Sequence, residues 1–230
     1  ARLFEALIPL KLNWFGLSTT LLGKDIHLLE LAARSGCTGL LMGFESITPE
    51  NLKRSLKGFN SPAQYKDLTT LLHKNGITLM ACFTFGLDSD TPEIFMQTAK
   101  FAVEAGIDLP RYAIVTPFPN TGLYKRLETE ERILTKNWEL YDAQHVVFQP
   151  KLMTPAQLYE GHEKAWKYTY SYSAMATRYL KSRIQTPVWW IANMGYRFYS
   201  HHLTDFYNCD WILGQLEPPQ VIDKQPDLIQ

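Results

Sequence analysis

The stretch that decides the fold runs from Gly36 to Glu50 and reads GCTGLLMGFESITPE. It begins with a glycine of the kind that ends helices and continues as an apolar run of strand length. It then turns through polar residues into Thr48-Pro49-Glu50, a start signal for a helix. A strand that leads directly into a helix is the repeating unit of parallel α/β proteins.

The same unit recurs on both sides of this stretch. Apolar runs of strand length lie at residues 14–17, 40–44, 77–85 and 112–115, and Gly36, Gly76 and Gly106 end the helical stretches between them. The runs are mostly continuous rather than alternating, which is typical of parallel strands buried on both faces. The sequence therefore predicts an α/β fold with a parallel sheet and right-handed crossovers.

The pattern changes after Pro117. Residues 118–153 contain turn signals without a strong period, and we interpret them as a segment that wraps around the end of a barrel. From Thr154 the chain becomes helical and rich in aromatic residues, and its last residues, 217–230, are expected to be extended. We therefore predict three parts, namely a partial (β/α) barrel in residues 1–117, a wrapping segment in 118–153 and a helical appendage with an extended tail in 154–230.

The composition excludes several classes of protein. Of the 230 residues 46% are hydrophobic, which excludes disorder, and 23 lysines and arginines balance 23 acidic residues. Without a basic stripe, no nucleic acid partner is expected. No apolar stretch reaches the ~20 residues of a membrane span and no signal peptide opens the chain, so we expect a soluble, cytoplasmic protein. The three cysteines, Cys37, Cys82 and Cys209, are far apart, and we expect buried thiols rather than disulfides or a metal site.

Polar side chains follow each predicted strand, and this is the edge at which parallel α/β sheets bind ligands. The candidates are Ser18, Thr20, Glu45, Ser46, Thr84, Asp88 and Thr116. Such a set of hydroxyls and carboxylates suits a small molecule rich in hydroxyl groups better than it suits a phosphate. Each residue also has a local explanation, since hydroxyls satisfy nearby backbone groups, and Asp88 and Asp90 are expected to open a loop and cap the next helix.

The histidines and the aromatic helices have ordinary interpretations. We expect His27, His73 and His162 to lie on solvated helix faces and His145, near Asp142, to be structural. For the aromatic residues after Thr154, a packed core is the first interpretation and contact with a partner domain the second. A membrane-surface helix ranks third, because the polar face is not strongly basic.

Several segments together resemble radical S-adenosylmethionine (SAM) enzymes of the subgroup that carries a cobalamin-binding domain. The resemblance rests on residues 14–20, 36–47, 83–88 (FTFGLD), 116–122 (TPFPNTG), 138–148 (WELYDAQHVVF) and 151–158. It covers most of residues 10–175. Members of this family have a partial (β/α)6 barrel of the TIM type, in which a CxxxCxxC loop holds a [4Fe-4S] cluster and SAM is cleaved to a 5′-deoxyadenosyl radical.

The resemblance implies roles for six residues and no particular catalytic residue. Glu45 and Ser46 match the strand end that reaches the ribose or methionyl part of SAM in the family, and Ser18 and Thr20 match the neighbouring strand end. Thr84 and Thr116 match later strand ends that line adenosine or substrate. Asn120 stands where the family's Pro-Gly-Thr turn most often has glycine.

No two cysteines of this chain have the CxxxCxxC spacing. We therefore expect the chain to begin after the cluster loop, with the cluster and cobalamin bound by a preceding part, and to be inactive alone. The resemblance implies a cobalamin-dependent enzyme that uses SAM and an external electron donor. Such an enzyme would transfer a methyl group to, or rearrange, an unreactive carbon of a small-molecule substrate.

Two alternatives remain open from the sequence. One is a non-catalytic partial barrel that acts as an interaction module through its aromatic helices. The other is an unrelated α/β barrel lyase or hydrolase that uses Glu45 and Asp88 as acid and base.

Overall fold

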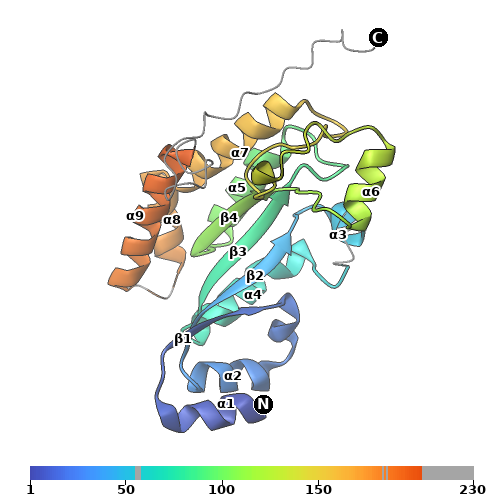
Figure 1. Ribbon diagram of the computed structural model, residues 1–230. Coiled ribbons are helices and arrows are strands. Elements are labelled where there is room, and N and C mark those ends of the chain that lie inside the picture. The colour runs from blue at the N-terminus through green and yellow to red at the C-terminus, as the bar shows by residue number, and fades with distance from the viewer. Residues whose placement is uncertain (55–57, 183, 185, 204–230) are drawn as a thin grey trace, which may run out of the picture.

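A computed structural model describes residues 1–54, 58–182, 184 and 186–203 of the chain. Cys209 and the tail predicted to be extended, residues 217–230, lie outside the described residues. Four parallel strands form one sheet in the order β1-β2-β3-β4 (Figure 1). They are β1 (Trp14–Ser18), β2 (Cys37–Glu45), β3 (Thr78–Phe85) and β4 (Leu109–Ile114). Each predicted apolar run overlaps one of these strands, which confirms the α/β fold.

Helices connect the strands and extend the chain beyond them. They are α1 (Arg2–Leu7), α2 (Ile26–Arg34), α3 (Pro49–Arg54), α4 (Pro62–Lys74), α5 (Ile94–Glu104), α6 (Gly122–Thr129), α7 (Pro155–Thr169), α8 (Tyr172–Lys181) and α9 (Pro187–His201), with the short 3-10 helices η1 (Ile8–Leu10), η2 (Thr20–Lys24) and η3 (Trp138–Leu140). The predicted helix stops are confirmed at Gly36, where φ is 95° and a Cβ would lie 1.7 Å from the Leu12 carbonyl oxygen. Within the described ranges, no helix combines the length and apolarity needed to cross a membrane.

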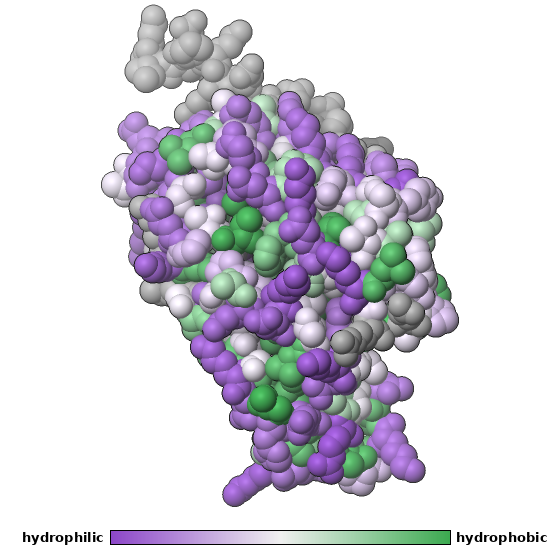
Figure 2. Space-filling view, turned by 180° about the vertical axis from the view of Figure 1, so that it is seen from behind, coloured by the Kyte–Doolittle hydropathy of each residue, from purple (hydrophilic) through white to green (hydrophobic). Residues whose placement is uncertain are grey.

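One face of the sheet, which we call the outer face, is buried by helices that lie behind the strands in Figure 1. Aromatic side chains make this contact, in the pairs Phe44 with Tyr65 of α4, Phe85 with Phe95 of α5, and Tyr112 with Trp166 of α7. Seen from behind, the surface of these helices is largely hydrophilic, with hydrophobic side chains in separate patches (Figure 2). The outer face therefore forms the core of the protein.

The opposite, inner face is only partly covered, so the expectation that the strands are buried on both faces is wrong. Buried and half-buried residues alternate along β3, and Phe15 and Leu17 of β1 are 52% and 82% exposed. The reason is that α4, α5 and α7 pack on the outer face, whereas helices reach the inner face only in part, at the cavity through α6 and at Met80 through Tyr196 of α9. Gly43, Cys82 and Arg111 are register partners on the inner face.

The carboxylate of Asp108 joins the C-terminal helices to the sheet. This residue precedes β4, is fully buried, and accepts hydrogen bonds at 2.7–2.9 Å from four groups. The donors are His73 of α4, the Leu79 amide of β3, Ser182 after α8 and Trp189 of α9. Buried Arg178 of α8 donates to the carbonyl oxygens of residues 107 and 108. Segments that are far apart in the sequence thus meet at one acceptor.

Two histidines are buried, so their predicted solvated positions are wrong. His73 bonds to Asp108, and His162 of α7 accepts a hydrogen bond from the Trp166 indole at 3.0 Å. Burial lowers the pKa of His162 to about 4, because the charged imidazolium would lose its hydration. Each histidine has a specific polar partner, which makes its burial tolerable. His27 is exposed, as predicted.

We predict that Asp108→Ala lowers the free energy of unfolding by about 3–5 kcal/mol, because it leaves several buried hydrogen-bond donors without an acceptor. Urea unfolding followed by circular dichroism measures this change. Asp67→Ala removes an exposed carboxylate of α4 and should stay within about 0.5 kcal/mol of the wild type. Equal effects of the two substitutions would contradict the assigned role of Asp108.

We also predict that His162 makes the protein less stable in mild acid. Its folded-state pKa of about 4 lies below the unfolded value of 6.5, so its contribution is complete above pH 6.5 and is lost as the pH falls toward 4. Relative to His162→Gln, the wild type should lose about 2 kcal/mol more between pH 7 and pH 5. Parallel urea titrations at the two pH values test this, and identical pH dependence of the two proteins would refute it.

Candidate functional site

A cavity of about 340 Å³ lies at the carboxyl ends of β2, β3 and β4, on the inner face. Its polar lining residues are Glu45, Thr84, Asp88, Thr116 and Arg126, and its apolar lining residues include Leu87, Val115, Leu123, Leu127 and Phe148. Cavities of this size, with a mainly apolar lining and a few convergent polar groups, are typical of small-molecule sites. The position agrees with the rule that ligands bind at the carboxyl edge of parallel sheets.

Glu45 lines the cavity in an unusual backbone conformation. Its φ of 65° is left-handed, and the ladder between β2 and β3 is irregular between Gly43 and Glu45. The carboxylate folds back over Gly43, where a Cβ would lie 2.3 Å from Glu45 Oε1. The Thr84 hydroxyl donates to Oε2 at 3.1 Å. Backbone strain of this kind persists only where the surroundings enforce it, and it is concentrated at functional sites.

Side chains from other segments hold this irregular strand end. Asn60 Nδ2 donates to the carbonyl oxygens of Gly43 and Phe44 at 3.0 and 3.2 Å, and the Tyr65 hydroxyl donates to that of Phe44 at 2.6 Å. The Thr20 hydroxyl in turn donates to Asn60 Oδ1 at 2.5 Å. Thr20, a predicted site residue, therefore supports the end of β2 and is not among the residues that line the cavity.

Ser46 and Ser18 also lie outside the cavity lining. Ser46 is only 4% exposed, and its hydroxyl accepts from the Thr48 amide at 3.0 Å where α3 begins. Ser18 ends β1, and its hydroxyl contacts the Thr19 carbonyl oxygen at 3.4 Å. Of the six predicted residues, the structure brings three together in the cavity, namely Glu45, Thr84 and Thr116.

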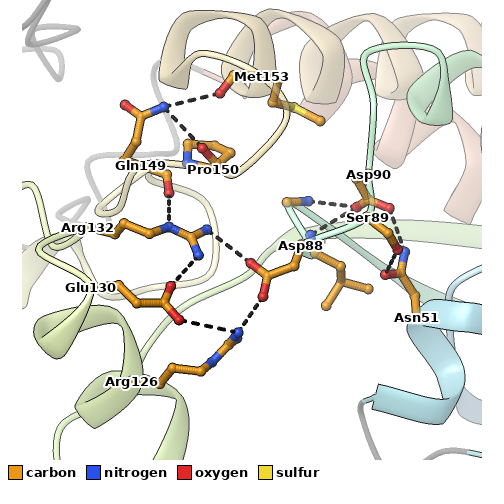
Figure 3. Close-up of polar contacts among 12 residues, drawn as sticks. Asn51, Asp88, Ser89, Asp90, Arg126, Glu130, Arg132, Gln149, Pro150 and Met153 are labelled. Carbon is orange, nitrogen blue, oxygen red and sulfur yellow. Dashed lines mark hydrogen bonds and ion pairs between the residues drawn. The ribbon is translucent and has the colours of Figure 1, made fainter.

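An ion-pair network closes one side of the cavity (Figure 3). Asp88 pairs with Arg126 of α6 and, at 3.0 Å, with Arg132, which also pairs with Glu130 at 2.7 Å. Arg132 Nε donates to the Gln149 carbonyl oxygen at 2.8 Å. The network therefore joins three parts of the chain. These are the loop after β3 at Asp88, helix α6 at Arg126, and the wrapping segment at Arg132 and Gln149.

This network fixes the charge state of Asp88. Burial alone would raise the pKa of this carboxyl, but the hydrogen bonds from Arg126 and Arg132 outweigh burial and hold the pKa below its usual value. Asp88 therefore stays ionised. Glu45 and Asp88 do share the cavity, as an acid and base pair would require, but an ionised carboxylate held by two guanidinium groups is a poor general acid.

Asp90 braces the loop after β3 instead of capping a helix, so that part of its prediction is wrong. It is 2% exposed, and Oδ2 accepts from the amides of Gly86 and Leu87 at 3.0 Å each. Asn51 of α3 donates to Oδ1 at 2.7 Å, and α5 begins later, at Ile94. Burial raises the pKa of Asp90 to about 6 despite these donors.

The sequence did not identify the part of the cavity lining that we call the roof, which is formed by residues of α6 and by Phe148. Leu123, Arg126 and Leu127 of α6 and Phe148 of the wrapping segment contribute to its walls, but residues 118–153 show no strong period. A usable signal was present in Thr121, whose hydroxyl caps α6 by accepting from the Tyr124 amide at 3.2 Å.

Asn120 and His145 have structural explanations within the wrapping segment. Asn120 adopts a φ of 65°, so asparagine here takes the left-handed conformation that glycine usually provides. His145 is buried and its Nδ1 lies 2.9 Å from Asp142 Oδ2, as expected for a structural histidine.

The described cysteines do not fit a metal cluster. Cys37 is buried at the start of β2, where burial raises the pKa of its thiol to about 11, and burial also raises the pKa of Cys82 in the middle of β3. Thiolates rather than thiols bind metals. Among the residues that the structure describes, no three His, Cys, Asp or Glu side chains are grouped as a metal site would require.

Comparison with known proteins identifies relatives. Residues 121–219 match a family described as a domain of unknown function, DUF4070. The chain is 32% identical over 197 residues to the bacteriochlorophyllide d C-12(1)-methyltransferase of Chlorobaculum tepidum, covering 85% of this chain and 42% of that protein. It is 27% identical over 159 residues to the anaerobic magnesium-protoporphyrin IX monomethyl ester cyclase of Cereibacter sphaeroides, covering 67% of this chain and 25% of the cyclase.

A solved structure gives a corresponding likeness in fold. The radical SAM methyltransferase TsrM from Kitasatospora setae, with cobalamin and a [4Fe-4S] cluster bound, superimposes with a TM-score of 0.50 at 18% identity, over 56% of this chain and 27% of that one. The chain is therefore homologous to methyltransferases and cyclases, and it shares the fold of a radical SAM methyltransferase, as the resemblance implied. The chain spans less than half the length of each of these relatives.

We predict that Asp88→Asn loosens the roof of the cavity. Loss of the ionised partner of both arginines should make amide hydrogen exchange in residues 121–132 about tenfold faster. Hydrogen–deuterium exchange with mass spectrometry measures this. Glu128→Gln removes an exposed ion pair with Lys136 in the same segment and should change exchange little. Unchanged exchange in Asp88→Asn would show that the network does not hold α6.

Proposed function

We propose that this chain, a relative of methyltransferases and cyclases with the fold of a radical SAM enzyme, is the SAM-binding part of a cobalamin-dependent radical SAM enzyme. The whole protein would transfer a methyl group to, or rearrange, an unreactive carbon of a small-molecule substrate. The observation that carries the proposal is the cavity in which the left-handed Glu45 and Thr84 meet at the strand ends.

The cavity fits the nucleoside part of SAM in two respects. Its polar wall offers a carboxylate at Glu45 and hydroxyls at Thr84 and Thr116, and a carboxylate is a strong acceptor for the two neighbouring hydroxyls of a ribose. Its apolar lining residues, which include Val115, Leu127 and Phe148, suit the planar, weakly polar adenine. We assign cofactor contacts to Glu45, Thr84 and Thr116.

The remaining predicted residues would act by positioning. Thr20 supports the end of β2 through Asn60, and Ser46 fixes the turn into α3, so both help to hold Glu45 in its left-handed conformation. Ser18 ends the neighbouring strand β1. The roof of the cavity, held by the ion pairs of Asp88, would exclude water from the bound nucleoside.

SAM bound in this cavity supplies an activated methyl group and, on reduction, the adenosyl group for radical chemistry. The described residues of this chain do not fit the [4Fe-4S] cluster, so its ligands and those of cobalamin would belong to other parts of the whole protein. The proposal also includes an external electron donor. It further includes a cytoplasmic location, because Cys37 and Cys82 are free thiols, as in a reducing compartment.

We predict that Glu45→Gln weakens SAM binding about 10- to 100-fold in the full-length protein, because the amide loses the charged acceptor for the ribose hydroxyls. Isothermal titration under anaerobic conditions measures this affinity. Formation of 5′-deoxyadenosine from SAM on reduction should fall in parallel.

Glu93→Gln is the matched control. Its carboxylate is fully exposed before α5 and does not line the cavity, so both affinity and product formation should remain at the wild-type level. If Glu45→Gln binds SAM as tightly as Glu93→Gln does, Glu45 is not a SAM contact. If the full-length protein forms no 5′-deoxyadenosine and binds no cluster, the radical assignment fails.

A further inference from the structure

Helix α9 has apolar residues on two opposite faces. One face packs into the protein through buried Trp189 and half-buried Tyr196, which stacks on Trp166. The opposite face carries Ile191 and Phe198, which are 72% and 58% exposed. A helix that is apolar on both sides has a second partner besides its own core.

The exposed apolar residues continue from α9 onto α8. Together they form a surface that we call the apolar stripe, made up of Tyr172, Leu180, Val188, Trp190, Ile191, Met194 and Phe198. In Figure 2, a hydrophobic patch lies near the right-hand edge, the side on which α8 and α9 are found. An exposed apolar surface of this extent marks a site of interaction.

Two cations lie beside the stripe without a carboxylate partner among the described residues. Residues 164–204 contain six lysines and arginines, of which Lys164 and Lys167 pair with Glu160 and Glu163, Arg178 is buried and Arg183 lies outside the described residues, so Lys181 and Arg197 remain. Arg197 stacks on Tyr172 at 3.9 Å and donates to the Tyr170 carbonyl oxygen, and Lys181 donates to the Glu104 carbonyl oxygen. Among the described residues neither cation is paired with a carboxylate.

Positive charges also affect His201 at the end of α9. Partial burial and the positive charges of Arg197, Lys167 and His202 lower the pKa of His201. Lys167 is itself paired with Glu163, so among the described residues the cations beside the stripe that lack a carboxylate partner are Lys181 and Arg197.

We propose that α8 and α9 form a docking site for an anionic lipid surface. Apolar side chains with Trp190 at their border, flanked by unpaired cations, match the two components of such a surface, namely the acyl boundary and the negative headgroups. Because α9 has 15 residues, it is too short to span a bilayer and would lie in the interface. The sequence ranked this interpretation last because the polar face of the helix is not strongly basic. The exposure of the stripe, together with Lys181 and Arg197, which have no carboxylate partner among the described residues, reverses that ranking.

A protein partner is the competing occupant of the stripe. A protein partner would need a matching acidic and apolar surface, whereas an anionic lipid surface supplies both components at once. The proposal is independent of SAM chemistry, because none of the stripe residues lines the cavity at the strand ends.

The test is co-sedimentation of the full-length protein with vesicles. Vesicles of equal parts phosphatidylglycerol and phosphatidylcholine should bind the wild type, and vesicles of phosphatidylcholine alone should bind it at least about tenfold more weakly. High salt should release the protein from the anionic vesicles. The double variant Ile191→Ser/Phe198→Ser should lose about tenfold or more of the anionic binding.

Leu3→Ser/Leu17→Ser is the matched control, because both leucines are highly exposed but belong to α1 and β1. This variant should bind the anionic vesicles as the wild type does, and circular dichroism should show all three proteins folded. Equal binding of the wild type and the stripe variant would overturn the proposal. A second result would also overturn it, namely that neither the wild type nor the stripe variant binds vesicles and that the stripe substitutions change the oligomeric state on size exclusion. That result would assign the stripe to a protein contact.

Discussion

The burial of one carboxylate, that of Asp108, is the constraint on which the rest of the structure depends. A carboxyl group is tolerated inside a protein only when hydrogen-bond partners surround it, and here the partners come from α4, β3 and the C-terminal helices. Arg178, also buried, binds the adjacent carbonyl oxygens. This convergence places α8 and α9 beside the edge of the sheet, so the helical part shares one core with the strands and leaves the inner face open.

The open inner face makes the cavity possible, and the irregular end of β2 gives it chemistry. Because Glu45 is left-handed, its carboxylate turns back over Gly43 toward Thr84. The strain is sustained by Asn60 and Tyr65, which satisfy the carbonyl groups that the irregular ladder exposes. A rigid sheet, a strained strand end and a roof held by ion pairs together preorganise the site.

The sequence predicted the parts of the fold that local chemistry decides. Apolar runs located the four strands of the described sheet, and the predicted change to helix at Thr154 is confirmed, since Thr154 caps α7. The sequence did not predict contacts between residues that are brought together only in the folded chain. The bond between Thr20 and Asn60 joins residues 40 positions apart, and the pair of His73 and Asp108 joins residues 35 positions apart.

The same limit applies to the candidate site. The hydroxyls and the carboxylate at the strand ends were visible in the sequence because strand ends of parallel sheets converge. Arg126 and Arg132 were not, because their role follows from the path of the wrapping segment and from the charge of Asp88. The similarity to methyltransferases and cyclases supports the proposed function, which the residues alone left open.

The central claim is that Glu45 binds the ribose of SAM. The most direct measurement is a double-mutant cycle on the full-length protein, in which S-adenosylhomocysteine and its 2′-deoxyribose and 3′-deoxyribose analogues bind the wild type and Glu45→Gln. If Glu45 contacts the ribose, removal of a ribose hydroxyl should weaken binding to the wild type by about tenfold and should have little effect on binding to Glu45→Gln. Equal losses of affinity in the two proteins would show that Glu45 does not contact the ribose, which would contradict the proposed role of Glu45.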